Sequence, residues 1–264
     1  MHLRPPAFFT VLGVIALPLS LEAQRSGDQS RLVLTISAGW VGGKHLWTVD
    51  KQPFRLIDPA DTLQLGREIR STLALGVGGT YFPGEHLGFS AEGFLIGLGY
   101  EDSCRLVFAS GHPDVATGCQ SIQGNTKDAT AVILSVGPVL RMNSRKLISP
   151  YARANLGLVF SNQSSLRTEG PLRNGSGSVL IVYADDHESR VEPALALGAG
   201  FTAAVGPGYQ LRWELRDNIV GVQKVTGPTT QGMSIPPHEL DYKHLISMTI
   251  GFDVVLERRR GRRY

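Results

Sequence analysis

The feature that most constrains this chain is a repeated alternation of apolar and polar residues with a period of two. Eight such runs lie at about residues 31–40, 68–81, 87–99, 132–141, 151–160, 192–202, 210–216 and 246–256. In the seventh run, Leu211, Trp213 and Leu215 alternate with polar residues. This period indicates β-strands with two chemically different faces, and long helical periodicity is missing. The sequence therefore predicts an all-β chain.

The third run changes phase in its middle. Leu87 and Phe89 are on the apolar face at first, whereas Phe94, Ile96 and Leu98 continue the alternation one residue out of step. One extra residue in a strand produces such a shift, so the pattern predicts a β-bulge near Gly93.

The connections between the runs are of two kinds. Three are short and rich in turn residues, at 82–85, 143–146 and 205–208. The other four are long, at about 42–67, 101–127, 162–190 and 223–242, and contain many Gly, Ser, Asn, Asp and Pro residues. Short turns at one end and long loops at the other are typical of a transmembrane barrel.

The polar faces of the runs favour a membrane barrel over a soluble one. They are rich in small residues and carry charges of both signs, which can pair across a narrow lumen. Aromatic residues near strand ends, such as Trp40, Tyr81 and Tyr209, fit the girdles of membrane barrels. We therefore expect an eight-stranded antiparallel transmembrane up-and-down β-barrel. The alternative is a soluble periplasmic lipocalin-like binder with its apolar face inside.

The interior of an eight-stranded barrel is just wide enough to be filled by side chains. We expect a polar network in the lumen made of Arg70, Glu92, Arg141, Arg153, Glu192, Arg212, Glu214, Arg216 and Asp253.

The chain ends suggest export. Residues 1–23 have a short basic region, an apolar run and Ala23 before a polar segment, as in a cleaved signal peptide. Residues 24–257 are then the barrel, and 258–264 are an Arg-rich periplasmic tail. The net charge is +3, and the five tail arginines leave the rest of the chain slightly negative. This balance argues against nucleic acid as a partner.

Two cysteines, Cys104 and Cys119, lie in the second long connection. Because an exported protein meets an oxidising compartment, we expect a disulfide between them.

The whole arrangement resembles the small outer-membrane barrels of the OmpA-like transmembrane and OmpW or opacity-protein type. The last run is also similar to their assembly signal, at Thr249, Gly251, Val254 and Leu256. Those proteins usually end on an aromatic residue of the final strand, whereas here the Arg-rich tail follows. The resemblance implies an outer-membrane location in a Gram-negative envelope, with membrane lipid and the barrel assembly machinery as partners.

Four functions remain open on the sequence. We favour a structural or surface-interaction barrel whose long loops meet an extracellular ligand. The alternatives are a porin-like channel or transporter for small solutes, a lipid-modifying enzyme and the soluble binder. No catalytic constellation stands out, so we expect no enzyme and no cofactor. The sequence Asp185-Asp186-His187 fits a solvated loop better than a metal site.

Overall fold

The computed structural model describes residues 31–53, 61–108, 113–142, 147–162, 166–171, 179–184, 190–229 and 235–257. The predicted signal peptide, the Arg-rich tail and the Asp185–His187 segment lie outside the described residues. Within the described residues, no helix is long and apolar enough to cross a membrane.

Eight strands form a closed antiparallel barrel, as the alternation predicts. Each predicted run contains residues of one barrel strand, and the second run, 68–81, also includes the end of the strand that precedes it. In order around the barrel, the strands are β1 (Arg31–Val41), β14 (His238–Glu257), β13 (Tyr209–Val225), β12 (Arg190–Gly206), β9 (Ile148–Ser161), β8 (Thr130–Arg141), β5 (Leu87–Gly97) and β4 (Thr72–Phe82).

The barrel turns its apolar face outward. Val77 and Val136 are each 62% exposed, while the alternate positions point into the lumen. We call this outward surface the apolar belt. It includes Leu34, Ile36, Leu73, Leu75, Val77, Phe89, Leu95, Leu134, Val136, Leu156, Leu158, Leu197, Phe201, Leu215, Met248 and Ile250. A continuous exposed apolar band of this kind requires lipid around it, so the soluble alternative, which needs the opposite orientation, is wrong.

Aromatic residues lie toward both ends of the apolar belt. Tyr209 and Phe252 stack with ring centroids 5.7 Å apart near the short-turn end. Trp40 is 65% exposed toward the opposite end of its strand. The turn between β12 and β13 contains Gly208, whose φ of +80° suits a residue without a side chain. These features agree with the predicted girdles and tight turns.

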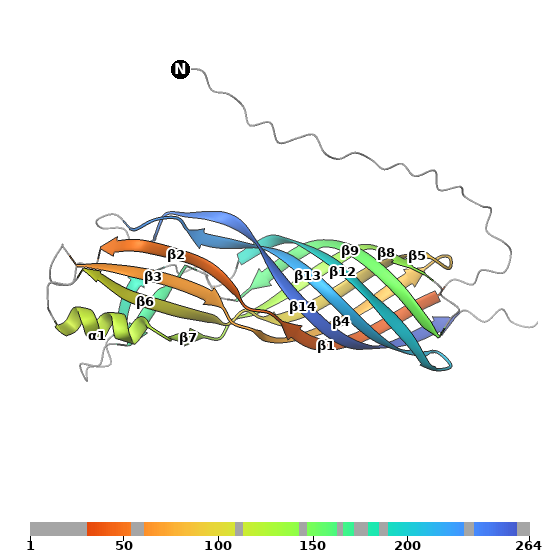
Figure 1. Ribbon diagram of the computed structural model, residues 1–264. Coiled ribbons are helices and arrows are strands. Elements are labelled where there is room, and N and C mark those ends of the chain that lie inside the picture. The colour runs from red at the N-terminus through yellow and green to blue at the C-terminus, as the bar shows by residue number, and fades with distance from the viewer. Residues whose placement is uncertain are drawn as a thin grey trace, which may run out of the picture.

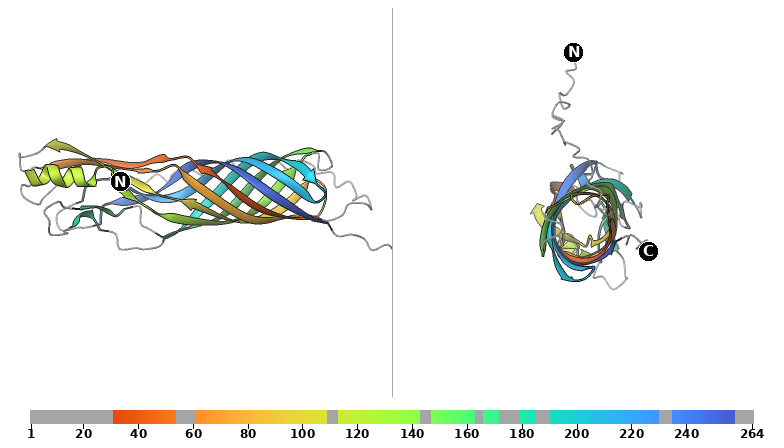
Figure 2. Two further views of the ribbon diagram at one scale, coloured as in Figure 1. Left: turned by 90° about the horizontal axis from the view of Figure 1, so that it is seen from below. Right: turned by 90° about the vertical axis from the view of Figure 1, so that its right-hand side faces the viewer.

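The long connections are not plain loops. They contain a four-stranded sheet of β2 (Lys44–Pro53), β3 (Thr62–Ile69), β6 (Tyr100–Phe108) and β7 (Thr126–Lys127), and a two-stranded sheet of β10 (Thr168–Pro171) and β11 (Val179–Tyr183). The helix α1 (Pro113–Ile122) lies beside them. We call these seven elements the cap. Figures 1 and 2 show it extending the barrel along its axis, at the end away from the short turns.

The predicted bulge near Gly93 is wrong. β5 pairs with both neighbours through that region without a register shift. Phe94 and Ile96 point into the barrel, whereas Leu87 and Phe89 point outward. Along β5, the apolar residues move from the outward face to the inward face because the surroundings of the strand change along the barrel axis. Near the short turns the apolar side faces lipid, and near the cap it faces an apolar core.

Candidate functional site

The middle of the lumen is filled by a network of ion pairs, the first group of which links β5, β9 and β13. Arg153 of β9 lies between two carboxylates, with its Nη1 2.8 Å from Glu92 Oε2 and its Nη2 2.5 Å from Glu214 Oε1. Arg216 lies between the same two carboxylates. Its Nη2 is 2.6 Å from Glu92 Oε2, and its Nε is 2.9 Å from Glu214 Oε1. These four side chains are at most 8% exposed.

A second ion pair lies next to the first group. Arg212 Nη2 is 2.9 Å from Asp253 Oδ2, and Thr35 Oγ1 donates to the other oxygen of Asp253 at 2.8 Å. Tyr151 joins the two groups, because its hydroxyl donates to Glu214 Oε2 at 2.5 Å and its ring lies 4.9 Å from the Arg212 guanidinium. We call Glu92, Arg153, Arg212, Glu214, Arg216 and Asp253 the plug.

The plug is electrically balanced, with three arginines against three carboxylates. Buried charges persist in a protein interior only when they are paired and hydrogen-bonded. The cavity beside Glu92, Arg153 and Arg212 has a volume of about 10 Å³, which is roughly enough for one water molecule. Among the described residues, paired side chains therefore occupy the lumen at this level.

Six of the nine residues predicted for the lumen network form the plug, and three lie elsewhere. Arg70 points outward above the apolar belt, where its side chain is 48% exposed and lies 3.9 Å from Glu101. Its placement in the lumen was wrong. Arg141 is inside near the short turns, with its guanidinium 4.1 Å from the centroid of the Phe82 ring. Glu192 lies near the cap and accepts a hydrogen bond from Gln223 Nε2 at 2.9 Å.

Sequence reasoning left Thr35 and Tyr151 out of the network. Both lie on the inward face of a barrel strand, in step with the charged residues. Tyr151 is two residues before Arg153 on β9. Since residues two positions apart in a strand point to the same face, Tyr151 points into the lumen as Arg153 does. Hydroxyl groups at inward positions were the available signal.

Above the plug, barrel and cap share one apolar core. Phe94, Ile133 and Val159 from the barrel are buried in one cluster with Trp47 and Leu65 from the cap. The packed core of the barrel therefore continues into the cap.

One ion pair is buried at the centre of the cap. Arg67 and Asp102 are cross-strand partners on β3 and β6, with side chains 0% and 1% exposed. The guanidinium donates from Nε to Oδ1 at 2.6 Å and from Nη2 to Oδ2 at 2.8 Å. It also lies 5.6 Å from the Trp47 ring centroid and 5.3 Å from that of Tyr100.

Arg67 also joins the two sheets of the cap. Its Nη2 donates to the backbone oxygen of Arg167 at 2.5 Å and to Thr168 Oγ1 at 3.3 Å. The long-loop prediction missed this site. An arginine in step with Leu63, Leu65 and Ile69 on one face of a run was the available signal.

Two further polar contacts hold β10 and β11 in place. The Tyr183 hydroxyl donates to Gln52 Oε1 at 2.9 Å, and Gln52 Nε2 donates to Thr229 Oγ1 at 2.7 Å. Burial raises the pKa of Tyr183, so this hydroxyl remains a donor. Burial also acts to raise the pKa of Glu169, but hydrogen bonds from Lys127 and Arg167 outweigh it and lower that pKa. Glu169 Oε1 lies 2.7 Å from Lys127 Nζ.

Cys104 of β6 and Cys119 of α1 are joined by a disulfide, with 15 residues of sequence separation and a Cα–Cα distance of 5.4 Å. This bond attaches the helix to the four-stranded sheet.

Replacing both cysteines with serine is expected to destabilise the cap by about 3 kcal/mol, because a loop of this length gains that much freedom in the unfolded chain. Limited proteolysis between β6 and β7 measures the change. The mobility difference between unheated and boiled protein in SDS gels, which reports the folded barrel, should persist. Equal protease resistance of the variant and the wild type would contradict a structural role for this bond.

The residues of the predicted assembly signal occupy both faces of β14. Thr249 and Gly251 point into the lumen, whereas Leu256 is 48% exposed on the outer face, in step with Val254. Their role in assembly stays a prediction. Among the described residues, no group of three or more His, Cys, Asp or Glu side chains could hold a metal ion.

Comparisons with known proteins give structural likeness alone. No family model matches the chain, and neither does any curated protein. Three solved structures are similar in architecture. The outer membrane protein OprG from Pseudomonas aeruginosa is 10% identical, with 88% of this chain and 98% of that chain covered and a TM-score of 0.48. Neisserial surface protein A is 13% identical, with coverage of 86% and 99% and a TM-score of 0.44. The attachment invasion locus protein Ail of Yersinia pestis is 13% identical, with coverage of 87% and 99% and a TM-score of 0.41.

The geometry determines the class of the protein. A closed barrel satisfies all of its backbone hydrogen bonds between strands, so it can cross a bilayer. An even strand number, an apolar belt and short turns at one end are the architecture of outer-membrane barrels. The chain is a membrane-spanning β-barrel of the outer-membrane type. In such barrels the short turns are periplasmic.

Proposed function

We propose that this barrel is a closed anchor that presents the folded cap at the cell surface for contact with an extracellular ligand. The observation that carries the proposal is that two successive obstructions fill the lumen. The plug occupies the middle of the barrel, and the core around Phe94 and Trp47 fills its mouth. A solute therefore meets paired charges and then packed apolar side chains.

The length of the strands supports the same view. A membrane-crossing β-strand needs about 9–11 residues. β13 has 17 residues and β14 has 20, so both continue well beyond the bilayer. Together with the disulfide and the Arg67–Asp102 pair, they provide a rigid outer structure. Rigidity of this kind suits recognition by a preformed surface.

The purified protein is expected to produce no conductance steps in planar lipid bilayers. The double variant Glu92→Ala with Arg216→Ala removes one ion pair of the plug without leaving either partner behind. It should also stay closed, because the apolar core above it remains.

The channel alternative predicts the opposite result. Conductance of the wild type that changes in the Glu92→Ala, Arg216→Ala variant would overturn the closed anchor. The enzyme alternative is tested by lipid analysis of cells that express the protein, where we expect no change in lipid A or phospholipid composition.

A further inference from the structure

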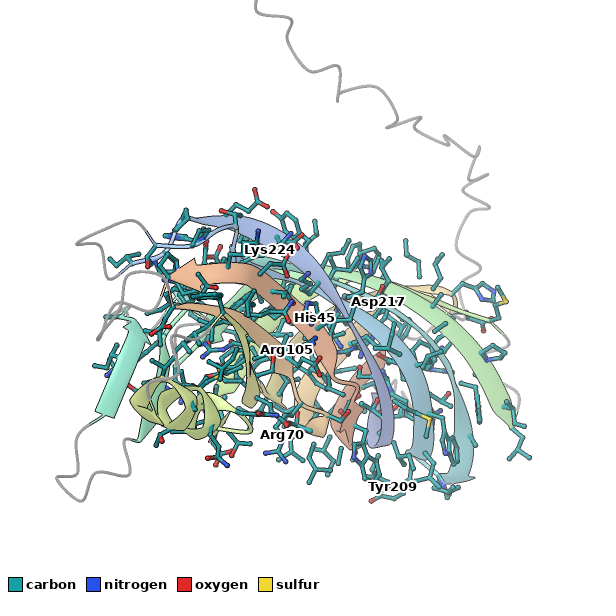
Figure 3. The ribbon with its side chains drawn as sticks, turned by 60° about the vertical axis from the view of Figure 1, so that its left-hand side comes forward. His45, Arg70, Arg105, Tyr209, Asp217 and Lys224 are labelled. Carbon is teal, nitrogen blue, oxygen red and sulfur yellow. A yellow bond between two sulfur atoms is a disulfide. The ribbon has the colours of Figure 1, made fainter. Side chains whose placement is uncertain are left out.

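A groove crosses the outer wall where the apolar belt meets the cap. Its volume is about 500 Å³, and its walls are the β3–β4 connection on one side and the start of β8 on the other. Leu75 and Leu95 line its membrane end, whereas Arg70 and Asp128 line its cap end. Figure 3 shows Arg70 at this junction between cap and barrel. The groove thus begins against lipid and ends in water.

Backbone pairing places the charged residues in one row. The Arg70 N–H donates to the Gly99 oxygen at 2.8 Å, and the Leu98 N–H donates to the Ala129 oxygen at 2.7 Å. Since Tyr100 pairs with Lys127, Gly99 lies between Arg70 and Asp128 across three neighbouring strands. Two strand spacings separate the backbones of Arg70 and Asp128 by about 10 Å.

Gly99 leaves the space between the two charges empty. Among the described residues beyond its chain neighbours, a Cβ at this position would meet the Lys127 backbone oxygen alone, in ordinary van der Waals contact at 3.5 Å. The Arg70 side chain is 48% exposed, and its contact with Glu101 is long at 3.9 Å. Asp128 is exposed as well. A cation and an anion therefore border one pocket, with room for a group between them.

The apolar end of the groove is part of the apolar belt. Leu73 is 67% exposed, Leu75 is 55% exposed and Leu95 is 41% exposed, and all three point outward. In a bilayer, acyl chains cover this surface. A ligand that lies in the groove is thus in contact with lipid along its lower half.

We propose that this groove binds a phospholipid whose headgroup carries both a phosphate and an ammonium. The phosphate lies against the Arg70 guanidinium, the ammonium against Asp128, and one acyl chain follows Leu73, Leu75 and Leu95. A purely anionic headgroup satisfies Arg70 but brings its charge close to Asp128 and Glu101. The arrangement of charges therefore selects the zwitterion. This inference concerns the outer wall and does not depend on the ligand of the cap.

The test is native mass spectrometry of the folded, delipidated protein with an equal mixture of phosphatidylethanolamine, phosphatidylglycerol and diacylglycerol. We expect one phosphatidylethanolamine to be retained about tenfold better than either competitor, which corresponds to roughly 1.4 kcal/mol. Arg70→Gln should reduce its retention about tenfold, since one charge-assisted contact is lost. Asp128→Asn should remove the preference over phosphatidylglycerol while keeping phosphate binding.

Two controls separate this site from general lipid adhesion. Arg105→Gln changes an exposed arginine on the same cap sheet, about 20 Å farther along β6, and it should have no effect. Gly99→Leu fills the groove and should abolish retention. The mobility shift on heating confirms that each variant is folded.

Three results would overturn the proposal. The first is equal retention of all three lipids by the wild type. The second is an equal loss in the Arg70→Gln and Arg105→Gln variants. The third is equally tight binding of phosphoethanolamine without acyl chains, which would assign the groove to a soluble ligand.

Discussion

Replacing Glu214 with alanine is expected to lower the free energy of unfolding of the barrel by about 3–5 kcal/mol. Glu214 contacts Arg153, Arg216 and the Tyr151 hydroxyl at 2.5–2.9 Å, and its side chain is fully buried. Its removal leaves two guanidinium groups sharing the single carboxylate of Glu92. The cost comes from the uncompensated buried charge rather than from lost packing.

Urea unfolding in lipid vesicles, followed by tryptophan emission, measures this effect. Glu239→Ala is the matched control. Glu239 is 61% exposed and lies 3.9 Å from Lys224 Nζ, so the same substitution there should cost about 0–1 kcal/mol. If both variants unfold at the same urea concentration, the plug does not stabilise the barrel as described.

Replacing Asp102 with alanine is expected to destabilise the cap by a similar amount, about 3–5 kcal/mol. Arg67 then remains in the core of the cap with its carboxylate partner gone. Because the barrel has its own hydrogen-bonded wall, the effect should be confined to the cap. Amide hydrogen exchange is expected to rise in β3, β6 and β10, while exchange in β9 and β12 stays slow.

The double variant Arg67→Met with Asp102→Leu provides the control. Replacing both members of a buried pair with apolar residues of similar volume is often neutral or stabilising, so protection in the cap should return. Exchange that rises equally in barrel and cap would contradict a cap that unfolds separately. The Asp102→Ala variant also provides a tool for the surface role, since a ligand of the cap should be lost while the barrel stays folded.

The sequence predicts the barrel well because eight runs of alternating apolar and polar residues together indicate β-strands with one apolar and one polar face. The inward charges follow from the same parity, which is why Glu92, Arg153 and Arg212 lie in the lumen as expected. The face that a residue occupies depends on its position within its own strand. An alternating run therefore reveals it without information on distant contacts.

Arg70 illustrates where this reasoning fails. Ile69 points into the cap and Leu73 points toward lipid, although both have odd numbers, because the chain slips by one residue at Arg70 and Ser71. A slip of one residue moves every following side chain to the other face. The alternation is equally regular on both sides of the slip, so the sequence shows one strand where the structure has two.

The cap could not be predicted for a related reason. Its strands β7, β10 and β11 are short. β2 has register shifts near Trp47 and between Val49 and Gln52, so the buried residues of β2 do not alternate regularly. The contacts that hold it, such as Arg67 to Asp102 and Tyr183 to Gln52, join residues 35 and 131 positions apart. Pairings at such distances leave no periodic signal in the sequence.

The most direct test of the account is lipid quenching of single tryptophans, because the three tryptophans of this chain occupy two different environments. Trp40 and Trp213 lie on the outer wall of the barrel, and Trp213 stacks on Phe201 of the apolar belt at 5.0 Å. Trp47 is 1% exposed in the core of the cap. Variants that retain one tryptophan, with phenylalanine at the other two positions, are reconstituted in vesicles of brominated lipid.

We expect brominated chains to quench Trp213 strongly and to leave Trp47 unaffected, while aqueous acrylamide quenches neither of them well. Quenching of Trp47 by bromine, or of Trp213 by acrylamide alone, would contradict a lipid-embedded barrel with a folded cap outside the membrane.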